Sequence, residues 1–185
     1  MKELSLHILD VAQNAAEAEA SLVRIDLRSG SDGWLTLSVA DDGKGMSQEL
    51  LSRVTDPFCT TRTTRRVGMG LPLLKLAAEQ TGGWLRVESL PREEDPARHG
   101  TTVTAAFRTR SVDCPPLGDV VSTVCTLVQG YPEIDWAFRQ VAPGLEVSFE
   151  TKALRKVLGP EVSLGENEVI LWIGEHLRQQ YENES

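Results

Sequence analysis

The chain has 185 residues, of which 41% are apolar and 25% are charged, and its formal net charge is −8. This composition is typical of a folded globular protein that is long enough to bury a sizeable core. The acidic balance argues against binding to nucleic acid or to an anionic membrane surface, because both require an excess of Lys and Arg. We therefore expect neither nucleic acid nor membrane among its partners.

The N-terminus and the cysteines predict a cytoplasmic location. The first residues, MKELSLHILD, are too polar for a signal peptide, and no run of the chain approaches the roughly 18 apolar residues of a membrane span. The cysteines, Cys59, Cys114 and Cys125, are odd in number and fit no metal-binding spacing. Free thiols in a reducing compartment are the simplest interpretation.

Hydrophobic periodicity predicts alternating helices and strands over the first 110 residues. Residues 2–20 have apolar positions at helical spacing, and residues 22–29 and 34–41 alternate as strands around a GSDG turn. Residues 70–83 predict a helix with Pro72 in its first turn, followed by strands over 84–89 and 101–107. A Pro-Pro pair near residue 115 marks a boundary, so we predict domains at 1–110 and 111–185.

The second predicted domain is a small α/β unit. Its patterns predict helices over 117–130, 151–159 and 167–182, and a hairpin of strands over 133–140 and 145–150. No constellation of catalytic or metal-binding residues stands out in it. Partner docking or homodimerisation is suggested by its position alone.

Residues 41–45 read Asp-Asp-Gly-Lys-Gly and follow the second predicted strand. Gly43 and Gly45 would let the backbone approach a flat ligand closely, and Asp41 could accept a hydrogen bond from an exocyclic amine such as that of adenine. The same residue types are common in plain surface turns, so the motif by itself leaves both interpretations open.

Asp10 and Asn14 lie four residues apart on the first predicted helix, and therefore on one face. The side-chain oxygen of Asn14 suits Mg²⁺, and Asp10 could orient or deprotonate a water or hydroxyl. A solvated polar helix face is the competing interpretation.

Hydroxyl and basic side chains crowd the segment DPFCTTRTTRRVGMGL, residues 56–71. Gly68 and Gly70 precede a helix, whose N-terminal N–H groups favour anions. Thr61 and Arg62 would add further donors. The segment suits a triphosphate, although a basic surface loop fits the same composition.

Taken in order, these segments resemble the GHKL (Bergerat) ATP-binding fold, most closely the catalytic domain of bacterial sensor histidine kinases. The resemblance covers residues 1 to about 108 and rests on NAAEAEA, DDGKGM, DPFCTTR, GMGLPLLKLAAEQTGGWLRVES and HGTTVTAAF. It implies an α+β fold, a two-layer α/β sandwich whose mixed sheet carries helices on one face, here with the small C-terminal unit added. It also implies ATP and Mg²⁺ as cofactors.

The resemblance implies a role for each matching residue. Asn14 would bind Mg²⁺, and Asp41 would accept from the adenine amine with Thr101 nearby. Residues 59–69 would form a short lid over the phosphates. The other positions implied to contact the nucleotide are Gly43, Gly45, Met46, Phe58, Thr61, Arg62, Gly68, Met69, Gly70 and Leu71.

Two departures from the family pattern bear on mechanism. Pro72 replaces the last glycine of the second glycine box and withholds one N–H donor. His7, His99 and His176 stand in no His-Glu or His-Asp phosphoacceptor box, so we expect a protein acceptor in trans. A nucleotide-gated, anti-sigma-like regulator that responds to ATP or ADP is an alternative, and so is a slow ATPase in which Asp10 acts as base beside Asn14.

Overall fold

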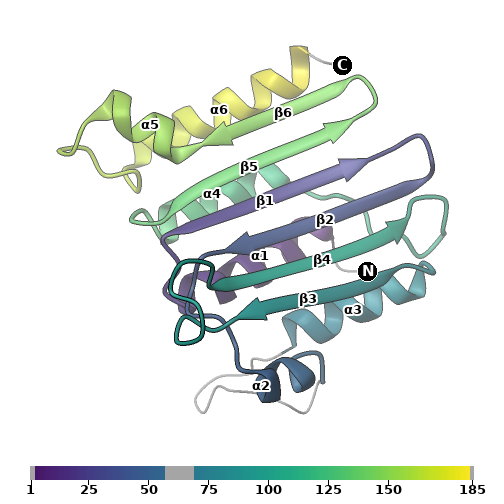
Figure 1. Cartoon of the computed structure of the whole chain (residues 1–185). Helices are drawn as coiled ribbons and strands as arrows, with labels where there is room; N and C mark the ends of the chain where they lie inside the picture. The colour runs from purple at the N-terminus through teal and green to yellow at the C-terminus, as the bar shows by residue number, and fades with distance from the viewer. Residues whose placement is uncertain (1–2, 57–68, 184–185) are drawn as a thin grey trace.

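The computed structural model describes residues 3–56 and 69–183. Within these ranges the chain forms a sheet and six helices (Figure 1). In chain order the elements are α1 (Leu4–Glu17), β1 (Leu22–Ser29), β2 (Trp34–Asp41), α2 (Gln48–Arg53), α3 (Gly70–Gln80), β3 (Trp84–Leu90), β4 (Gly100–Arg108), α4 (Val120–Gly130), β5 (Asp135–Ala142), β6 (Leu145–Glu150), α5 (Thr151–Leu158) and α6 (Asn167–Asn183). The helices and strands predicted from periodicity are confirmed, with ends that differ by a few residues.

The strands form one six-stranded sheet in the order β3-β4-β2-β1-β5-β6. The β1–β5 pair is parallel and the other pairs are antiparallel, so the sheet is mixed. This confirms the α+β class and the two-layer α/β sandwich. The parallel β1–β5 pair requires a crossover, which the intervening strands and α4 supply.

One face of the sheet carries most of the helices. Figure 1 shows α1, α3, α4 and α6 behind the sheet. On β1, the buried side chains Val23, Ile25 and Leu27 alternate with Arg24, Asp26 and Arg28, so the apolar set faces these helices and the charged set faces away. Val39 and Leu37 of β2 continue the same buried layer. The core therefore lies between the sheet and the helices.

The segment that joins the two predicted domains caps α1. Leu4 N–H donates to Pro116 O, and Ser5 N–H donates to Leu117 O, both at 2.9 Å. Thr123 Oγ1 of α4 donates to Ser5 O at 3.2 Å. The bonds to Pro116 O and Leu117 O satisfy N–H groups that the first turn of a helix leaves without an intrahelical partner. The helix that carries Asp10 and Asn14 is thus held by residues of the C-terminal part.

Both predicted domains contribute to this one sheet. Val23 is in register with Trp136, and Ile25 is in register with Phe138, so their side chains lie on the same buried face. The buried apolar residues of both parts form a single cluster. The division at residue 110 stays a prediction, and β5–β6 extends the sheet of the first part across that position.

Candidate functional site

Three strand ends and a loop meet around Asp41. Asp41 ends β2 and pairs with Thr101 of β4, which in turn pairs with Ser89 of β3. Ser89 Oγ and Thr101 Oγ1 are 2.8 Å apart, and Met46 N–H donates to Ser89 Oγ at 2.8 Å. We call Asp41, Met46, Ser89 and Thr101 the strand-end cluster. It brings together three of the residues predicted from sequence, on the helix-covered side of the sheet.

Burial and hydrogen bonding have opposite effects on the pKa of Asp41. Desolvation by burial raises the pKa of its carboxyl group above the usual 3.8, and backbone hydrogen bonds from Gly43 and Thr101 only partly offset this. Gly43 N–H donates to Asp41 Oδ1 at 2.8 Å. A further donor that reached this half-buried carboxylate would favour its charged form. The site is thus suited to a ligand that offers an N–H group.

The neighbouring Asp42 has a structural task instead. It accepts hydrogen bonds from Ser21 N–H at 2.7 Å, from the Ser21 hydroxyl and from Leu22 N–H at 2.9 Å. Desolvation acts to raise the pKa of Asp42, but these hydrogen bonds outweigh it and lower the pKa below 3.8. Asp42 therefore ties the end of β2 to the start of β1.

The glycines of the 41–45 loop are explained by contacts within the chain. Gly45 has φ +69°, and a Cβ there would lie 2.1 Å from Leu90 O. A Cβ on Gly43 would lie 2.7 Å from Ala18 O, and one on Gly100 would lie 2.0 Å from Asp41 O. Only glycine permits such close backbone approach. The predicted closeness of Gly43 and Gly45 to a base stays a prediction.

Asp10, Asn14 and the start of α3 meet at a second point. Asp10 is half-buried and Asn14 is exposed, one turn apart on α1. A Cβ built on Gly70, the first residue of α3, would lie 3.2 Å from Asp10 Cβ and 4.0 Å from Asn14 Nδ2. The polar face of α1 therefore abuts the N-terminus of an 11-residue helix, where backbone N–H groups and the helix dipole favour anions. We call this place the α1–α3 junction.

The remaining predicted site residues divide into two sets. Met69 is 49% exposed beside the junction, whereas the Leu71 side chain is buried in the core. Phe58, Thr61, Arg62 and Gly68, together with Cys59 and most of the predicted lid, lie outside the described residues. Their implied roles stay predictions.

Sequence reasoning missed Ser89 and His99. Ser89 Oγ bridges Met46 and Thr101, and His99 Nδ1 lies 2.6 Å from Gly43 O, which supports the 41–45 loop from the side. Ser89 could have been found by pairing β3 with β4, because that register sets it beside Thr101. His99 gave no signal, since it lies in an irregular turn and acts through a backbone atom.

Among the described residues, no helix is both long and apolar enough to cross a membrane.

Comparison with known proteins gives a family match over the first part of the chain. Residues 2–111 match the family described as histidine kinase-, DNA gyrase B-, and HSP90-like ATPase. The sensor histidine kinase ZraS of Klebsiella oxytoca is 34% identical over 86 residues, which are 45% of this chain and 18% of that protein. The sensor histidine kinase AruS of Pseudomonas aeruginosa is 30% identical over 173 residues, which are 89% of this chain and 17% of that protein. The chain thus spans less than a fifth of the length of these relatives.

Solved structures share the fold at low sequence identity. The N-terminal domain of a DNA repair protein has a TM-score of 0.55 and 14% identity, and covers 81% of this chain and 52% of that one. The MutL ATPase domain of Aquifex aeolicus, complexed with ADP, has a TM-score of 0.50 and 11% identity, and covers 74% of this chain and 59% of that one. At this identity the likeness shows the fold alone.

Proposed function

Because the chain belongs to the family of histidine kinase-, DNA gyrase B-, and HSP90-like ATPases, we propose that it binds ATP with Mg²⁺ and passes the γ-phosphate to a partner protein in trans. The observation that carries the proposal is the pairing of two sites on one side of the sheet. The strand-end cluster offers a half-buried carboxylate, and the α1–α3 junction offers an anion-favouring helix end beside Asn14.

The adenine would lie at the strand-end cluster. Asp41 accepts from the exocyclic amine, and this bond repays part of the desolvation that raises its pKa. Guanine presents a carbonyl oxygen at the same position. This oxygen and the Asp41 carboxylate are both acceptors, so no hydrogen bond could form between them. Thr101 and Ser89 supply the adjoining hydroxyls, already linked at 2.8 Å. ATP should therefore bind much more tightly than GTP.

The phosphates would lie at the α1–α3 junction. The side-chain oxygen of Asn14 is a hard ligand of the kind that Mg²⁺ accepts alongside phosphate oxygens. When bound, Mg²⁺ supplies charge neutralisation on the transferring phosphate. Backbone N–H groups at the start of α3 bind phosphate oxygens, and Asp10, next to Gly70, positions the Asn14 helix or accepts a proton from the attacking group.

An acceptor on another molecule is supported by the state of the histidines. The chain contains His7, His99 and His176. His7 is buried on α1, and His99 is bonded to Gly43 O. His176 is stacked on Trp172, on a helix that packs on β6 and not on the strands of the cluster. None of these three side chains is exposed, which favours a phosphate acceptor on another molecule.

Nucleotide selectivity tests the binding half of the proposal. Isothermal titration with Mg²⁺ should give ATP an affinity about 100-fold above that of GTP, and Asp41→Asn should weaken ATP binding by about 100-fold, because a charge-assisted hydrogen bond in a half-buried site is lost. Asp113→Asn, at an exposed carboxylate outside the site, is the matched control and should bind ATP as the wild type does. Equal affinity for ATP and GTP would refute the adenine site.

Phosphate transfer tests the other half. The protein is incubated with γ-labelled ATP, Mg²⁺ and an extract of its source cells, and label is followed into protein and into free phosphate. Transfer to a protein that is lost in Asn14→Ala, and kept in the control Asn183→Ala, supports the kinase. Release of free phosphate that is lost in Asp10→Asn would favour the ATPase. The position of Asp10 beside Gly70 is the observation that supports this alternative. Tight ATP binding with neither outcome would leave the nucleotide-gated regulator.

A further inference from the structure

A separate cavity of about 550 Å³ lies between α5 and the strands β1, β5 and β6. We call this cavity the α5 groove. Its lining includes Arg24 of β1, Ala137 of β5, Glu150 of β6, Leu154 and Val157 of α5, and Trp172 of α6. Arg24 belongs to the side-chain set of β1 that points away from the core. The volume is within the range of small-molecule sites, about 300–1,000 Å³.

The floor of the α5 groove has a polar row with a hollow at its centre. Arg24 is in register with Ala137, and Ala137 is in register with Glu150, so the three side chains stand in line across adjacent strands. Neighbouring strands are about 4.8 Å apart, which sets the backbones of Arg24 and Glu150 roughly 10 Å apart. The small Ala137 between them leaves the space open. A guanidinium and a carboxylate therefore flank one depression.

Arg24 and Glu150 differ from the neighbouring charged residues in their ion pairing. Asp26 pairs with Arg28 at 3.2 Å, and Arg139 pairs with Glu146 at 2.8 Å. In residues 3–56 and 69–183, by contrast, neither Arg24 nor Glu150 makes an ion pair or a side-chain hydrogen bond. The α5 groove thus keeps one positive and one negative group available for a ligand.

The walls of the α5 groove are apolar and exposed. Val157 is 83% exposed and Trp172 is 47% exposed, although side chains of this kind are usually buried. Trp172 stacks on His176 with ring centroids 4.8 Å apart and an interplanar angle of 7°. His176 is fixed in turn by Gln180: the Nε2 atom of Gln180 lies 3.0 Å from the Nε2 atom of His176. The result is a flat aromatic surface with fixed orientation.

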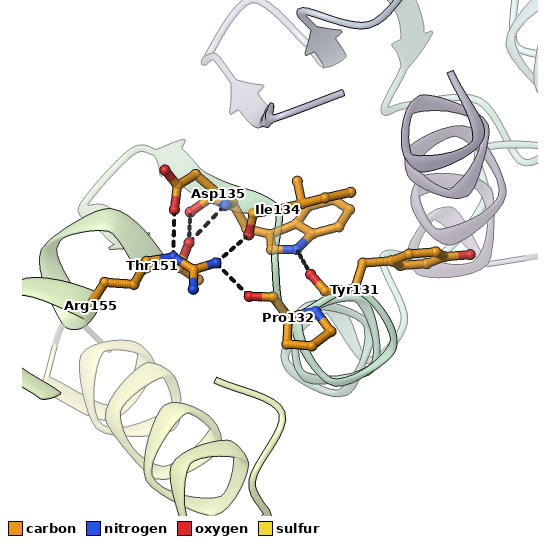
Figure 2. A network of polar contacts seen from close by, with 7 residues as sticks. Tyr131, Pro132, Ile134, Asp135, Thr151 and Arg155 are labelled. Atoms are coloured by element: carbon orange, nitrogen blue, oxygen red, sulfur yellow. Dashed lines mark hydrogen bonds and ion pairs between the residues drawn. The ribbon is translucent and has the colours of Figure 1, made fainter. Parts of the chain in front are cut away.

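The α5 groove is held open by the anchoring of α5 (Figure 2). Arg155 Nε of α5 donates to Asp135 Oδ1 at 2.9 Å, and its guanidinium also donates to the backbone carbonyls of Pro132 and Ile134. Thr151 Oγ1, at the start of α5, accepts from Trp136 N–H at 2.8 Å. Because these bonds fix α5 to the start of β5, the helix is not free to collapse onto Ala137, and the site is largely formed before any ligand arrives.

We propose that the α5 groove binds a small amphipathic zwitterion of the amino-acid class with an apolar side chain. Its carboxylate pairs with Arg24, its ammonium group pairs with Glu150, and its apolar body lies against Leu154, Val157 and Trp172. Two charged groups of opposite sign beside one apolar surface match this class better than a simple acid or amine, which pairs with only one of the two charges, or a hydrocarbon, which pairs with neither.

The test uses L-phenylalanine as the probe on the full chain labelled with ¹⁵N. The protein has four tryptophans and hence four indole N–H signals. Titration should shift the Trp172 signal and leave Trp84, which is 46% exposed on β3 at the other edge of the sheet, unchanged. L-phenylalanine should bind about tenfold more tightly than 3-phenylpropionate or phenethylamine, each of which lacks one charge.

Variants assign the two charges. Arg24→Gln should reduce the affinity for L-phenylalanine to that for phenethylamine, and Glu150→Gln should reduce it to that for 3-phenylpropionate. Trp172→Ala should weaken all three probes by about tenfold or more, and Trp84→Ala should weaken none. If N-acetyl-L-phenylalaninamide, which has neither charge, binds as tightly as L-phenylalanine, the groove is an apolar contact surface and the proposal is wrong. A shift of Trp84 equal to that of Trp172, or no shift of Trp172, also overturns it.

Discussion

The two halves of the sheet present their chemistry on opposite faces and by different means. On the helix-covered face, β2, β3 and β4 gather Asp41, Ser89 and Thr101 around a loop whose glycines press against other backbone atoms. On the other face, β1, β5 and β6 set Arg24, Ala137 and Glu150 in a row under α5. The first site depends on tight backbone packing and the second on side chains over an open hollow. The two should therefore respond differently to the same kind of substitution.

The largest difference is expected between two glycines with similar backbone angles. Gly45 has φ +69°, and a Cβ added there would lie 2.1 Å from Leu90 O. Gly144 has φ +75°, and a Cβ added there would have no neighbouring atom within 4 Å. Gly45→Ala should lower the free energy of unfolding by about 4 kcal/mol, and the melting temperature by about 10 °C, because steric overlap adds to the left-handed backbone cost.

Gly144→Ala is the matched control and should cost only about 1 kcal/mol, since only the backbone conformation is unfavourable for alanine. Calorimetry on both variants measures the two values. Equal melting temperatures would show that the 41–45 loop is not packed as tightly as its contacts with Leu90 indicate.

A smaller effect should come from Asp42. Asp42→Asn should cost about 1 kcal/mol at neutral pH, because the amide retains only part of the carboxylate's hydrogen bonding to Ser21 and Leu22. The folded pKa of Asp42 lies below 3.8, so its stabilisation is present above pH 3.8 and is lost as the pH falls through the lowered value. Denaturant titrations of the wild type and Asp42→Asn should therefore converge in strong acid. A gap that does not change with pH would contradict this.

The opposite sign is expected at Asp41 in the nucleotide-free protein. Its folded pKa is raised above 3.8 by burial, so the ionised carboxylate costs stability at neutral pH, and this cost disappears as the pH falls through the raised value. Asp41→Asn should therefore melt roughly 1 °C higher than the wild type at pH 7, and the difference should shrink toward pH 4. Asp113→Asn is the control for a carboxylate at an exposed position. A wild type that melts above Asp41→Asn at pH 7 would reverse the assigned sign.

The smallest difference is expected between the free energies of opening of the two halves of the sheet. The amides of residues 22–28 on β1 and 135–141 on β5 belong to one paired register. Because the buried residues of both parts form one cluster, native-state hydrogen exchange should give the hydrogen-bonded amides of both strands the same free energy of opening, within about 0.5 kcal/mol. Faster exchange confined to β5 and β6 would show that residues 111–185 open as a separate unit.

Much of the first part could be predicted from the sequence because local rules agree there. Alternation predicted β1 and β2, helical spacing predicted α1, and Pro72 with the preceding glycine predicted the start of α3. The order of the motifs around Asp10, Asn14, Asp41 and Thr101 was enough to indicate the family. The periodicity also predicted the hairpin and helices beyond residue 116, but not where they would attach.

Only the tertiary structure decided the rest, because the relations involved are between residues far apart in the chain. Local patterning specifies which side of a strand is apolar, but not which strand becomes its neighbour. The parallel pairing of β1 with β5 joins the two parts into one sheet and sets Arg24, Ala137 and Glu150 in line. The close approach of Gly70 to Asp10 and of Gly45 to Leu90 likewise follows from packing alone. The sequence by itself thus determined the elements and the family, and long-range pairing decided what those elements bring together.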